Sequence, residues 1–288
     1  MKHTLTSNKI SLTINSQGAE LSSVKNKNGL EFIWQAKPDV WARHAPVLFP
    51  IVGKLKNNQF IFEGKTYELP QHGFARDMEF SLKEKNDTSC VFELRSDTNT
   101  KKVFPFDFVF QIIYILNGNQ LTVQYNVKNP TPKALFFSLG AHPAFNVPLQ
   151  ANENFEDYYL EFEKNNYDIT ILNEGLRTSS KQNLEVKDKK LFLSKNLFDR
   201  DALVFENSQI DSVALCSSKS NRKIIMQSKN FPYFGIWSKK DCAEFVCLEP
   251  WFGIADHENT KQNFSQKEGI ISLKADEEFV CEFDLRFL

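Results

Sequence analysis

Residues 106–127 read FDFVFQIIYILNGNQLTVQYNV, and this stretch decides the fold class. Apolar side chains recur at every second position on both sides of the turn Asn117-Gly118-Asn119. A period of two is typical of β-strands, in which successive side chains point to opposite faces. Two such runs joined by a glycine turn indicate a β-hairpin. The stretch therefore predicts two long antiparallel strands, the second of which ends before Asn129-Pro130.

Shorter alternating runs follow along the rest of the chain, and no segment longer than two turns has a helical period. They lie at residues 10–14, 158–162, 213–215, 224–226, 234–236, 245–247 and 279–287, with a second hairpin at 60–69. Residues 150–200 are polar and irregular, so long loops or a short helix are expected there. No linker or fixed-length repeat divides the chain. We therefore expect an all-β fold, a single large antiparallel β-sandwich domain over residues 1–288; a barrel or propeller is less favoured.

The composition excludes several classes of protein. An apolar fraction of 41% and a charged fraction of 25% are ordinary for a soluble globular protein. A net charge of -1 argues against nucleic-acid binding and against electrostatic membrane binding. Neither a signal-peptide core nor a membrane-spanning run is recognisable. The five cysteines form no CxxC pair, which favours buried free thiols in a reducing cytoplasm over a metal site.

Four polar clusters interrupt the strand pattern, and the third contains His142. Pro143 restricts the backbone of His142 to extended geometry, while Gly140 and Ala141 leave room for a ligand. A restrained imidazole beside open space is suited to proton transfer, although a lone histidine is more often structural. The clusters are residues 43–54, 71–77, 138–148 and 247–253.

The fourth cluster contains Glu249, which follows Phe245 and Cys247 on the same strand face. If that face is buried, a carboxylate ends an apolar series just before Pro250. Partial burial would raise the pKa of Glu249 and make it a better base near neutral pH. The alternative is a glutamate at the end of a strand that points to solvent.

The second cluster combines a histidine with a cation. His72 precedes Gly73, so the chain can bend sharply there, and Arg76 could hold an anionic or oxygen-rich ligand. The alternative is an exposed turn with a surface ion pair between Arg76 and Asp77. Together with His142 and Glu249, and without a metal motif or a phosphate loop, these residues suggest acid–base chemistry on a polar, uncharged ligand.

Taken together, the clusters resemble the aldose 1-epimerase (mutarotase) family, and its LacX-type branch in particular. The resemblance implies a large antiparallel β-sandwich, the galactose mutarotase-like supersandwich, in agreement with the strand pattern. It also implies an isomerase of carbohydrate metabolism. The matching segments occur in the family's order and cover most of the chain: residues 44–50, 71–76, 141–146, 201–205 and 247–251.

The resemblance also implies residue roles. Glu249 matches the general base that takes the proton of the anomeric hydroxyl, and His142 matches the general acid that protonates the ring oxygen. The sugar opens to its aldehyde, turns about the C1–C2 bond and closes as the other anomer. His72 matches a second histidine that hydrogen-bonds the sugar. Neither cofactor nor metal is implied, and activity needs ionised Glu249 with protonated His142, which predicts a window near neutrality if neither pKa departs far.

Three further substrate-binding residues follow from the resemblance. Asp201 matches an aspartate that holds sugar hydroxyls, with Asp199 as a competitor. Lys54 stands where galactose mutarotases usually have an arginine, so sugar placement is expected to differ. Arg76 looks more like the phosphate-binding arginines of hexose-6-phosphate mutarotases. The expected partner is thus a hexose or a hexose phosphate, and a homodimer is left open.

Two other functions compete with this interpretation. A sugar-binding protein on the same sandwich would keep the site for recognition alone, without catalysis. A glycosidase would pair Glu249 with Asp201 across a glycosidic bond, but its mechanism leaves the two histidines without a purpose.

Overall fold

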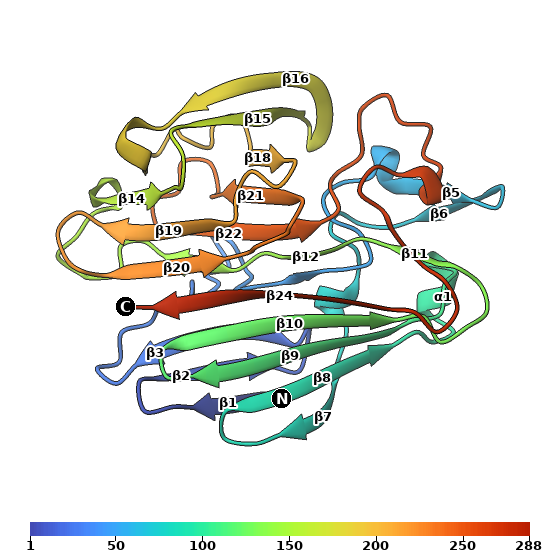
Figure 1. The fold of residues 1–288 in the computed structure, drawn as a ribbon, viewed down its shortest axis with the longest axis horizontal. Helices are drawn as coiled ribbons and strands as arrows, with labels where there is room; N and C mark the ends of the chain where they lie inside the picture. The colour runs from blue at the N-terminus through green and yellow to red at the C-terminus, as the bar shows by residue number, and fades with distance from the viewer.

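The computed structural model describes residues 1–288 and consists of β-strands with one short α-helix, α1 (Thr100–Val103), and five 3-10 turns. Two large sheets organise the molecule, and their strand pairs are antiparallel (Figure 1). The expected all-β class and antiparallel sandwich are confirmed. No helix is long and apolar enough to cross a membrane.

The nine-stranded sheet has the order β17-β14-β19-β20-β24-β10-β9-β8-β7. Its strands are β7 (Ser81–Lys85), β8 (Ser89–Arg95), β9 (Val109–Asn117), β10 (Gln120–Lys128), β14 (Tyr158–Glu161), β17 (Lys190–Phe192), β19 (Ser212–Ser217), β20 (Lys223–Gln227) and β24 (Glu278–Phe287). The predicted hairpin is β9 and β10, joined at Gly118 and Asn119, with Leu116 opposite Leu121. The alternation was a reliable signal because one face of each strand is buried while the other is partly exposed.

The eight-stranded sheet has the order β16-β15-β18-β21-β22-β12-β4, and β13 also pairs with β22. Its strands are β4 (Val47–Leu48), β12 (Leu139–Ala141), β13 (Ala144–Asn146), β15 (Asn166–Asn173), β16 (Leu176–Glu185), β18 (Leu203–Glu206), β21 (Tyr233–Trp237) and β22 (Phe245–Phe252). Strand β22 is buried along nearly its whole length, because it lies inside the sheet and both of its faces are covered. It is the element that carries Glu249.

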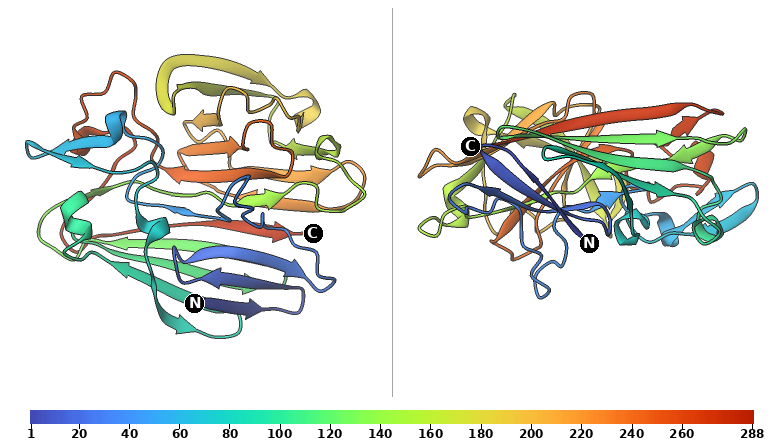
Figure 2. Two further views of the ribbon diagram at one scale, coloured as in Figure 1. Left: turned by 180° about the vertical axis from the view of Figure 1, so that it is seen from behind. Right: turned by 90° about the horizontal axis from the view of Figure 1, so that it is seen from below.

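Smaller sheets cover the two large ones. They comprise β1 (Lys2–Thr6), β2 (Ile10–Asn15) and β3 (Glu20–Asn26), the hairpin of β5 (Gln59–Phe62) and β6 (Lys65–Glu68), and the pair β11 (Leu135–Phe137) and β23 (Ile271–Leu273). The first of these packs over the β8–β10 region, as the views in Figures 1 and 2 show, and Tyr114 of β9 donates a hydrogen bond to the carbonyl of Ala19. One cluster of buried side chains includes residues of both large sheets.

The expectation of loops or a short helix across residues 150–200 is wrong for most of the segment, although two short 3-10 helices, η3 (Phe155–Asp157) and η4 (Lys187–Lys189), lie in it. This region contains β14, β17 and the long hairpin of β15 and β16. Strand β16 is at the edge of its sheet, and most of its residues are exposed. It therefore lacks the apolar alternation from which the other strands were recognised.

Candidate active site

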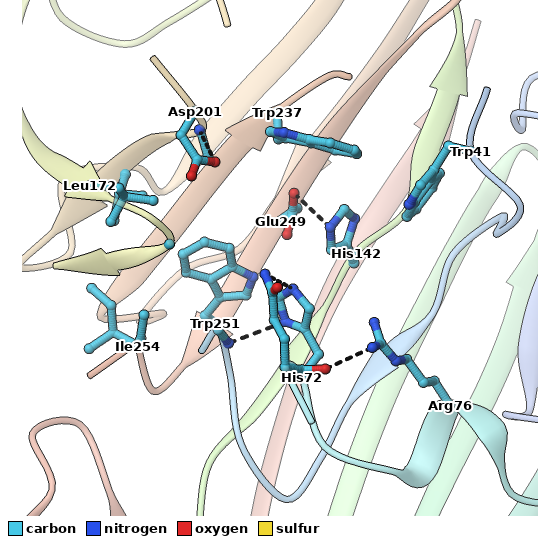
Figure 3. A pocket seen from close by; sticks show the side chains of 16 residues that line it. Trp41, His72, Arg76, His142, Leu172, Asp201, Trp237, Glu249, Trp251 and Ile254 are labelled. Carbon is cyan, nitrogen blue, oxygen red and sulfur yellow. Dashed lines mark hydrogen bonds and ion pairs between the residues drawn. The ribbon is translucent and has the colours of Figure 1, made fainter. Parts of the chain in front are cut away.

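A cavity of ≈ 320 Å³ opens over the eight-stranded sheet (Figure 3). Five of the six residues singled out from the sequence line it, namely Glu249, His142, His72, Arg76 and Asp201. Its volume is within the range of about 300–1,000 Å³ that is usual for small-molecule sites. The remaining lining residues are Trp41, Gly53, Gln71, Leu172, Gly175, Ala202, Val204, Trp237, Trp251, Ile254 and Ala255.

His142 and Glu249 face each other because of strand register. Gly140 pairs with Trp251 and Ala144 pairs with Cys247, so His142, between β12 and β13, falls opposite Glu249 of β22. Their side chains meet with His142 Nε2 3.3 Å from Glu249 Oε1. The two residues are only 7% and 1% exposed. A histidine and a carboxylate more than a hundred positions apart thus share one cavity wall.

Burial moves the ionisation of this pair in opposite directions. Removal from water raises the pKa of Glu249 well above its ordinary value; the indole N–H of Trp251 opposes this rise, and the charge of Asp201 adds to it. Removal from water also lowers the pKa of His142, and the charges of Arg76 and Arg43 act in the same direction. Both shifts disfavour the charged form. The condition attached to the expected pH window, that neither pKa departs far, is therefore not met in the sugar-free cavity.

Aromatic rings confine His142 on its other sides. Its ring stacks on Trp41 with centroids 5.0 Å apart and meets Trp237 edge to face at 5.7 Å. His72 lies perpendicular to it at 5.5 Å. The Nδ1 atom of His142 is buried without a hydrogen-bond partner. These contacts fix the ring plane without engaging both of its nitrogens.

His72 is held in a strained turn. Its φ is 67°, and Gly73 follows with a φ of 71°. A Cβ on Gly73 would lie 2.4 Å from the carbonyl oxygen of Phe49, so only glycine fits there. The backbone N–H of Gly53 donates to His72 Nδ1 at 3.2 Å. Burial lowers the pKa of His72 well below its ordinary value, so the ring is neutral and its Nε2 carries the proton.

Trp251 forms part of the cavity floor and is packed between two strands. A Cβ on Gly235 of β21 would lie 2.3 Å from the Trp251 ring, and one on Gly140 of β12 would lie 2.6 Å from it. Both glycines thus make room for the indole. Its Nε1 is buried without a partner, beside Glu249 on the same strand face. Gly235 gives no signal in the sequence, whereas Trp251 belongs to the fourth polar cluster and to a segment that resembles the aldose 1-epimerase family.

Of three polar residues that the resemblance offers for sugar binding, only one lines the cavity. Asp201 lies across the cavity from Arg76 (Figure 3), whereas its competitor Asp199 does not line the cavity. Lys54 does not line it either, because its ammonium group donates to the carbonyl of Glu174 at 3.0 Å. Gly175, which does line the cavity, lies close to the Lys54 side chain.

Arg76 is the cation nearest to the cavity. Its Nη2 donates to the carbonyl of Gln71 at 2.7 Å, and its Nε is buried without a hydrogen bond. Asp77 is 3.8 Å from that Nε and also pairs with Arg43 at 2.9 Å. Burial, together with the charge of Arg43, lowers the pKa of Arg76 to about 10, so it remains a cation at neutral pH.

The wall formed by Ile254 and Ala255 was missed by the sequence analysis. Two buried cations hold its backbone: Lys267 donates to the carbonyl of Ile254, and Arg177 Nε donates to that of Ala255 at 3.0 Å. The only sequence signal was the position of Ile254 and Ala255 directly after the Glu249 cluster. Arg177 and Lys267 are far from it in sequence and lie in no motif.

Comparisons with known proteins agree with the observed fold and with the family that the sequence motifs resemble. The profile of the aldose 1-epimerase family matches residues 1–283. The chain is 35% identical to the chromosomal LacX protein of Lactococcus lactis over 252 residues, which is 83% of each chain. The plasmid-encoded LacX protein of the same organism matches equally well.

Two solved structures resemble the whole chain. A galactose mutarotase related enzyme from Lactobacillus acidophilus has a TM-score of 0.95 at 36% identity, covering 100% of this chain and 97% of that one. A galactose mutarotase-like protein from Lactobacillus casei has a TM-score of 0.92 at 32% identity, covering 100% of both chains. From its sequence and its fold, this chain therefore belongs to the aldose 1-epimerase family.

Proposed function

We propose that the chain is an aldose 1-epimerase that interconverts the α and β anomers of a hexose, with Glu249 as general base and His142 as general acid. The observation that carries this proposal is the contact of 3.3 Å between His142 Nε2 and Glu249 Oε1 in a sugar-sized cavity. His142 and Glu249 pair only with each other and with no further charged side chain. Their protons are therefore available for exchange with a ligand.

The reaction needs two proton transfers in each direction. Glu249 takes the proton of the O1 hydroxyl while His142 gives its proton to the ring oxygen O5. The C1–O5 bond breaks, its electron pair stays on O5, and C1 becomes an aldehyde. Rotation about the C1–C2 bond presents the other carbonyl face, and the reverse transfers close the ring. Each positioned acid or base typically contributes about 10²–10⁴-fold, and such contributions fit a reaction that also proceeds unaided in water.

The buried pair suits this exchange because it carries one proton throughout. Before opening, the proton is on His142 and Glu249 is ionised; after opening, Glu249 holds a proton and His142 is neutral. Burial favours the second distribution. A hydroxyl donated to the carboxylate and a ring oxygen that accepts from the imidazole would favour the first. The pair therefore titrates as a unit, and its activity should decline when the pair holds no proton or two.

Other lining residues would orient the sugar. The Nε2–H of neutral His72, which lies 3.3 Å from the Gln71 amide nitrogen, can donate to a sugar oxygen. The Nε1–H of Trp251, beside Glu249, can do the same. Asp201, on the opposite side of the cavity, can accept hydrogen bonds from hydroxyl groups (Figure 3). The ring of Trp237 edges the space above Glu249 and offers an apolar surface to a pyranose.

Polarimetry of freshly dissolved α-D-glucose and α-D-galactose tests the proposal. The wild type should accelerate mutarotation of at least one of them, and Glu249→Gln and His142→Asn should each lower kcat by at least about 10²-fold. Asp199→Asn and His257→Asn serve as matched controls, because both residues lie outside the cavity. Saturable sugar binding without acceleration by the wild type would overturn the proposal in favour of a sugar-binding protein.

A second candidate, a hexose-6-phosphate mutarotase, is favoured by one observation. A groove of ≈ 730 Å³ adjoins the cavity, shares Trp41 and Arg76 with it, and contains Arg43. A phosphate on C6 could reach these arginines, whose planar groups suit phosphate oxygens. Exchange NMR of glucose 6-phosphate tests this: Arg76→Gln should lower kcat/KM for the phosphate ester by more than it does for glucose. Equal losses for both sugars would exclude the phosphate role.

A further inference from the structure

We propose that His142, Cys247 and Glu249 form a binding site for a thiophilic divalent cation such as Zn²⁺, and that this ion competes with the sugar. The competition rests on the proposed function, whereas the metal site itself does not. The cysteine pattern argued against a metal site, because the five cysteines form no closely spaced pair.

The three side chains converge from strand β22 and from the connection of β12 and β13. Cys247 and Glu249 are two positions apart on β22 and so point to the same face, and His142 reaches that face from the connection of β12 and β13. One ligand atom from each residue lies within 4.8 Å of the other two. All three residues are buried.

The spacing is close to that of a tetrahedral site. Zinc bonds of about 2.0–2.3 Å to nitrogen, oxygen and sulfur put neighbouring ligand atoms a little over 3 Å apart. The 3.3 Å between His142 Nε2 and Glu249 Oε1 already matches this. The Cys247 sulfur lies within 4.8 Å of both atoms and has to move closer to them to complete the set. Three protein ligands leave the fourth position for water, on the side where His142 and Glu249 line the cavity.

The chemistry of the ligands selects the ion. Thiol, imidazole and carboxylate groups together suit Zn²⁺ and Co²⁺, whereas Mg²⁺ and Ca²⁺ require a shell of oxygen ligands. As the metal–sulfur bond forms, the thiol proton of Cys247 leaves to solvent. The bound dication would also compensate the charge of Glu249, which has no lysine or arginine in contact with it.

Cys247 has no role in the proposed sugar reaction, which makes it a clean probe. It does not line the cavity, and its neighbours Trp34, Ala144, Cys242 and Phe245 form an apolar cluster. Its replacement should therefore spare mutarotation while it removes the soft ligand.

Cobalt titration of the full-length chain tests the site directly. Wild-type protein should bind one Co²⁺ with a thiolate-to-metal absorption in the near ultraviolet, and Zn²⁺ should displace it while Mg²⁺ should not. Cys247→Ser should abolish that absorption and weaken Zn²⁺ binding, measured by calorimetry, by at least about 10-fold, the lower bound for losing a supporting group. Cys216→Ser is the matched control, because it removes a buried thiol from β19 of the other large sheet.

Outcomes from other variants separate the alternatives. A cobalt–thiolate absorption that survives Cys247→Ser but is lost in Cys242→Ser would overturn the assignment of the sulfur ligand. If Cys247→Ser does not fold, Cys247→Ala repeats the experiment, and a wild type without the absorption overturns the site by itself.

Inhibition is measured separately from metal binding. Zn²⁺ should slow mutarotation competitively with the sugar, EDTA should restore the rate, and Cys247→Ser should shift the inhibition constant upward by the same factor as the Zn²⁺ affinity. Cobalt binding in a protein that does not catalyse mutarotation would leave the metal site standing and overturn the proposed function. Mutarotation without cobalt binding would support the proposed function and overturn the metal site.

Discussion

Glu249 and Glu206 are two buried glutamates of the same sheet, but their surroundings differ. Glu206, at the end of β18, is 8% exposed, and Glu249, within β22, is 1% exposed. Glu206 accepts hydrogen bonds from the hydroxyl of Thr170 and from Arg177 Nη1 at 3.3 Å. Glu249 lines the cavity, and its one ion-pair partner is His142. One carboxylate therefore has a permanent cation, and the other does not.

This difference separates a structural carboxylate from a functional one. A buried charge is costly unless it is paired, so an arginine fixed beside Glu206 compensates it in every state of the protein. The same compensation at Glu249 would lower its proton affinity and occupy the space of the sugar. A base that must gain and lose a proton is better served by a partner that does the same, which His142 is. The stability lost at Glu249 is the kind of cost that active sites retain.

The largest loss of stability is expected from removing Arg177, the cation that pairs with the structural carboxylate Glu206. Arg177→Leu leaves Glu206 buried without its partner and frees Glu268 as well. Breaking a buried pair in this way should lower the free energy of unfolding by about 3–5 kcal/mol, measured by urea denaturation. Lys101→Met is the control, since its exposed pair with Asp107 should contribute less than about 1 kcal/mol. Similar losses in both variants would contradict the buried pair's structural role.

A smaller loss of stability is expected from crowding Trp251, which lies beside Glu249. Gly235→Ala places a Cβ 2.3 Å from the Trp251 ring. Overpacking of this kind should cost about 1–3 kcal/mol and should reduce mutarotase activity as Trp251 moves beside Glu249. Trp251→Phe removes the ring atoms that clash, so Gly235→Ala should cost less in that background. A double-mutant cycle by denaturation measures this coupling, and strict additivity would show that the two side chains do not compete for space.

The third expected effect has the opposite sign. Glu249→Gln removes a carboxyl whose pKa is raised by burial, and should stabilise the protein by about 0.5–2 kcal/mol at neutral pH while it lowers kcat by at least about 10²-fold. Folded Glu249 keeps its proton at pH values where the unfolded chain has lost it, so wild-type stability decreases as pH rises above 4.5, the ordinary value. The glutamine does not titrate, and its advantage should therefore grow from pH 4 to pH 8.

Denaturation at several pH values measures that trend, and Glu206→Gln sharpens the contrast. This variant leaves Arg177 without one of its acidic partners and should destabilise the protein at neutral pH. If Glu249→Gln and Glu206→Gln changed stability in the same direction, the distinction between the two carboxylates would fail.

Local pattern was sufficient for the strands and for the residues held in short motifs. The β9–β10 hairpin was predictable because its alternation and its turn lie within one continuous stretch. Glu249 was identified from its phase on the strand, and His142 from its proline. Their approach could not be derived from such patterns, because it depends on β12, β13 and β22 pairing across more than a hundred residues.

Long-range packing accounts for what the sequence did not reveal. The β15–β16 hairpin was missed because β16 is an exposed edge strand with no apolar alternation. The dependence of Trp251 on Gly235 was missed because a glycine in a strand does not indicate which ring fills the space above it. Arg177 was missed because the carboxylates and carbonyls it contacts come from separate segments.

Lys54 offers the smallest effect and the most direct check on the resemblance to galactose mutarotases. The resemblance assigns it to the sugar, but its ammonium group binds the Glu174 carbonyl, and Lys54 does not line the cavity. Lys54→Met should therefore change transition-state binding by no more than about 0.5 kcal/mol, roughly a twofold change in kcat/KM. Asp201→Asn, which alters a residue lining the cavity, should raise KM by a clearly larger factor in the same polarimetric assay. A larger loss from Lys54→Met than from Asp201→Asn would mean that sugar binding draws the lysine away from Glu174, and that substrate recognition extends beyond the cavity wall.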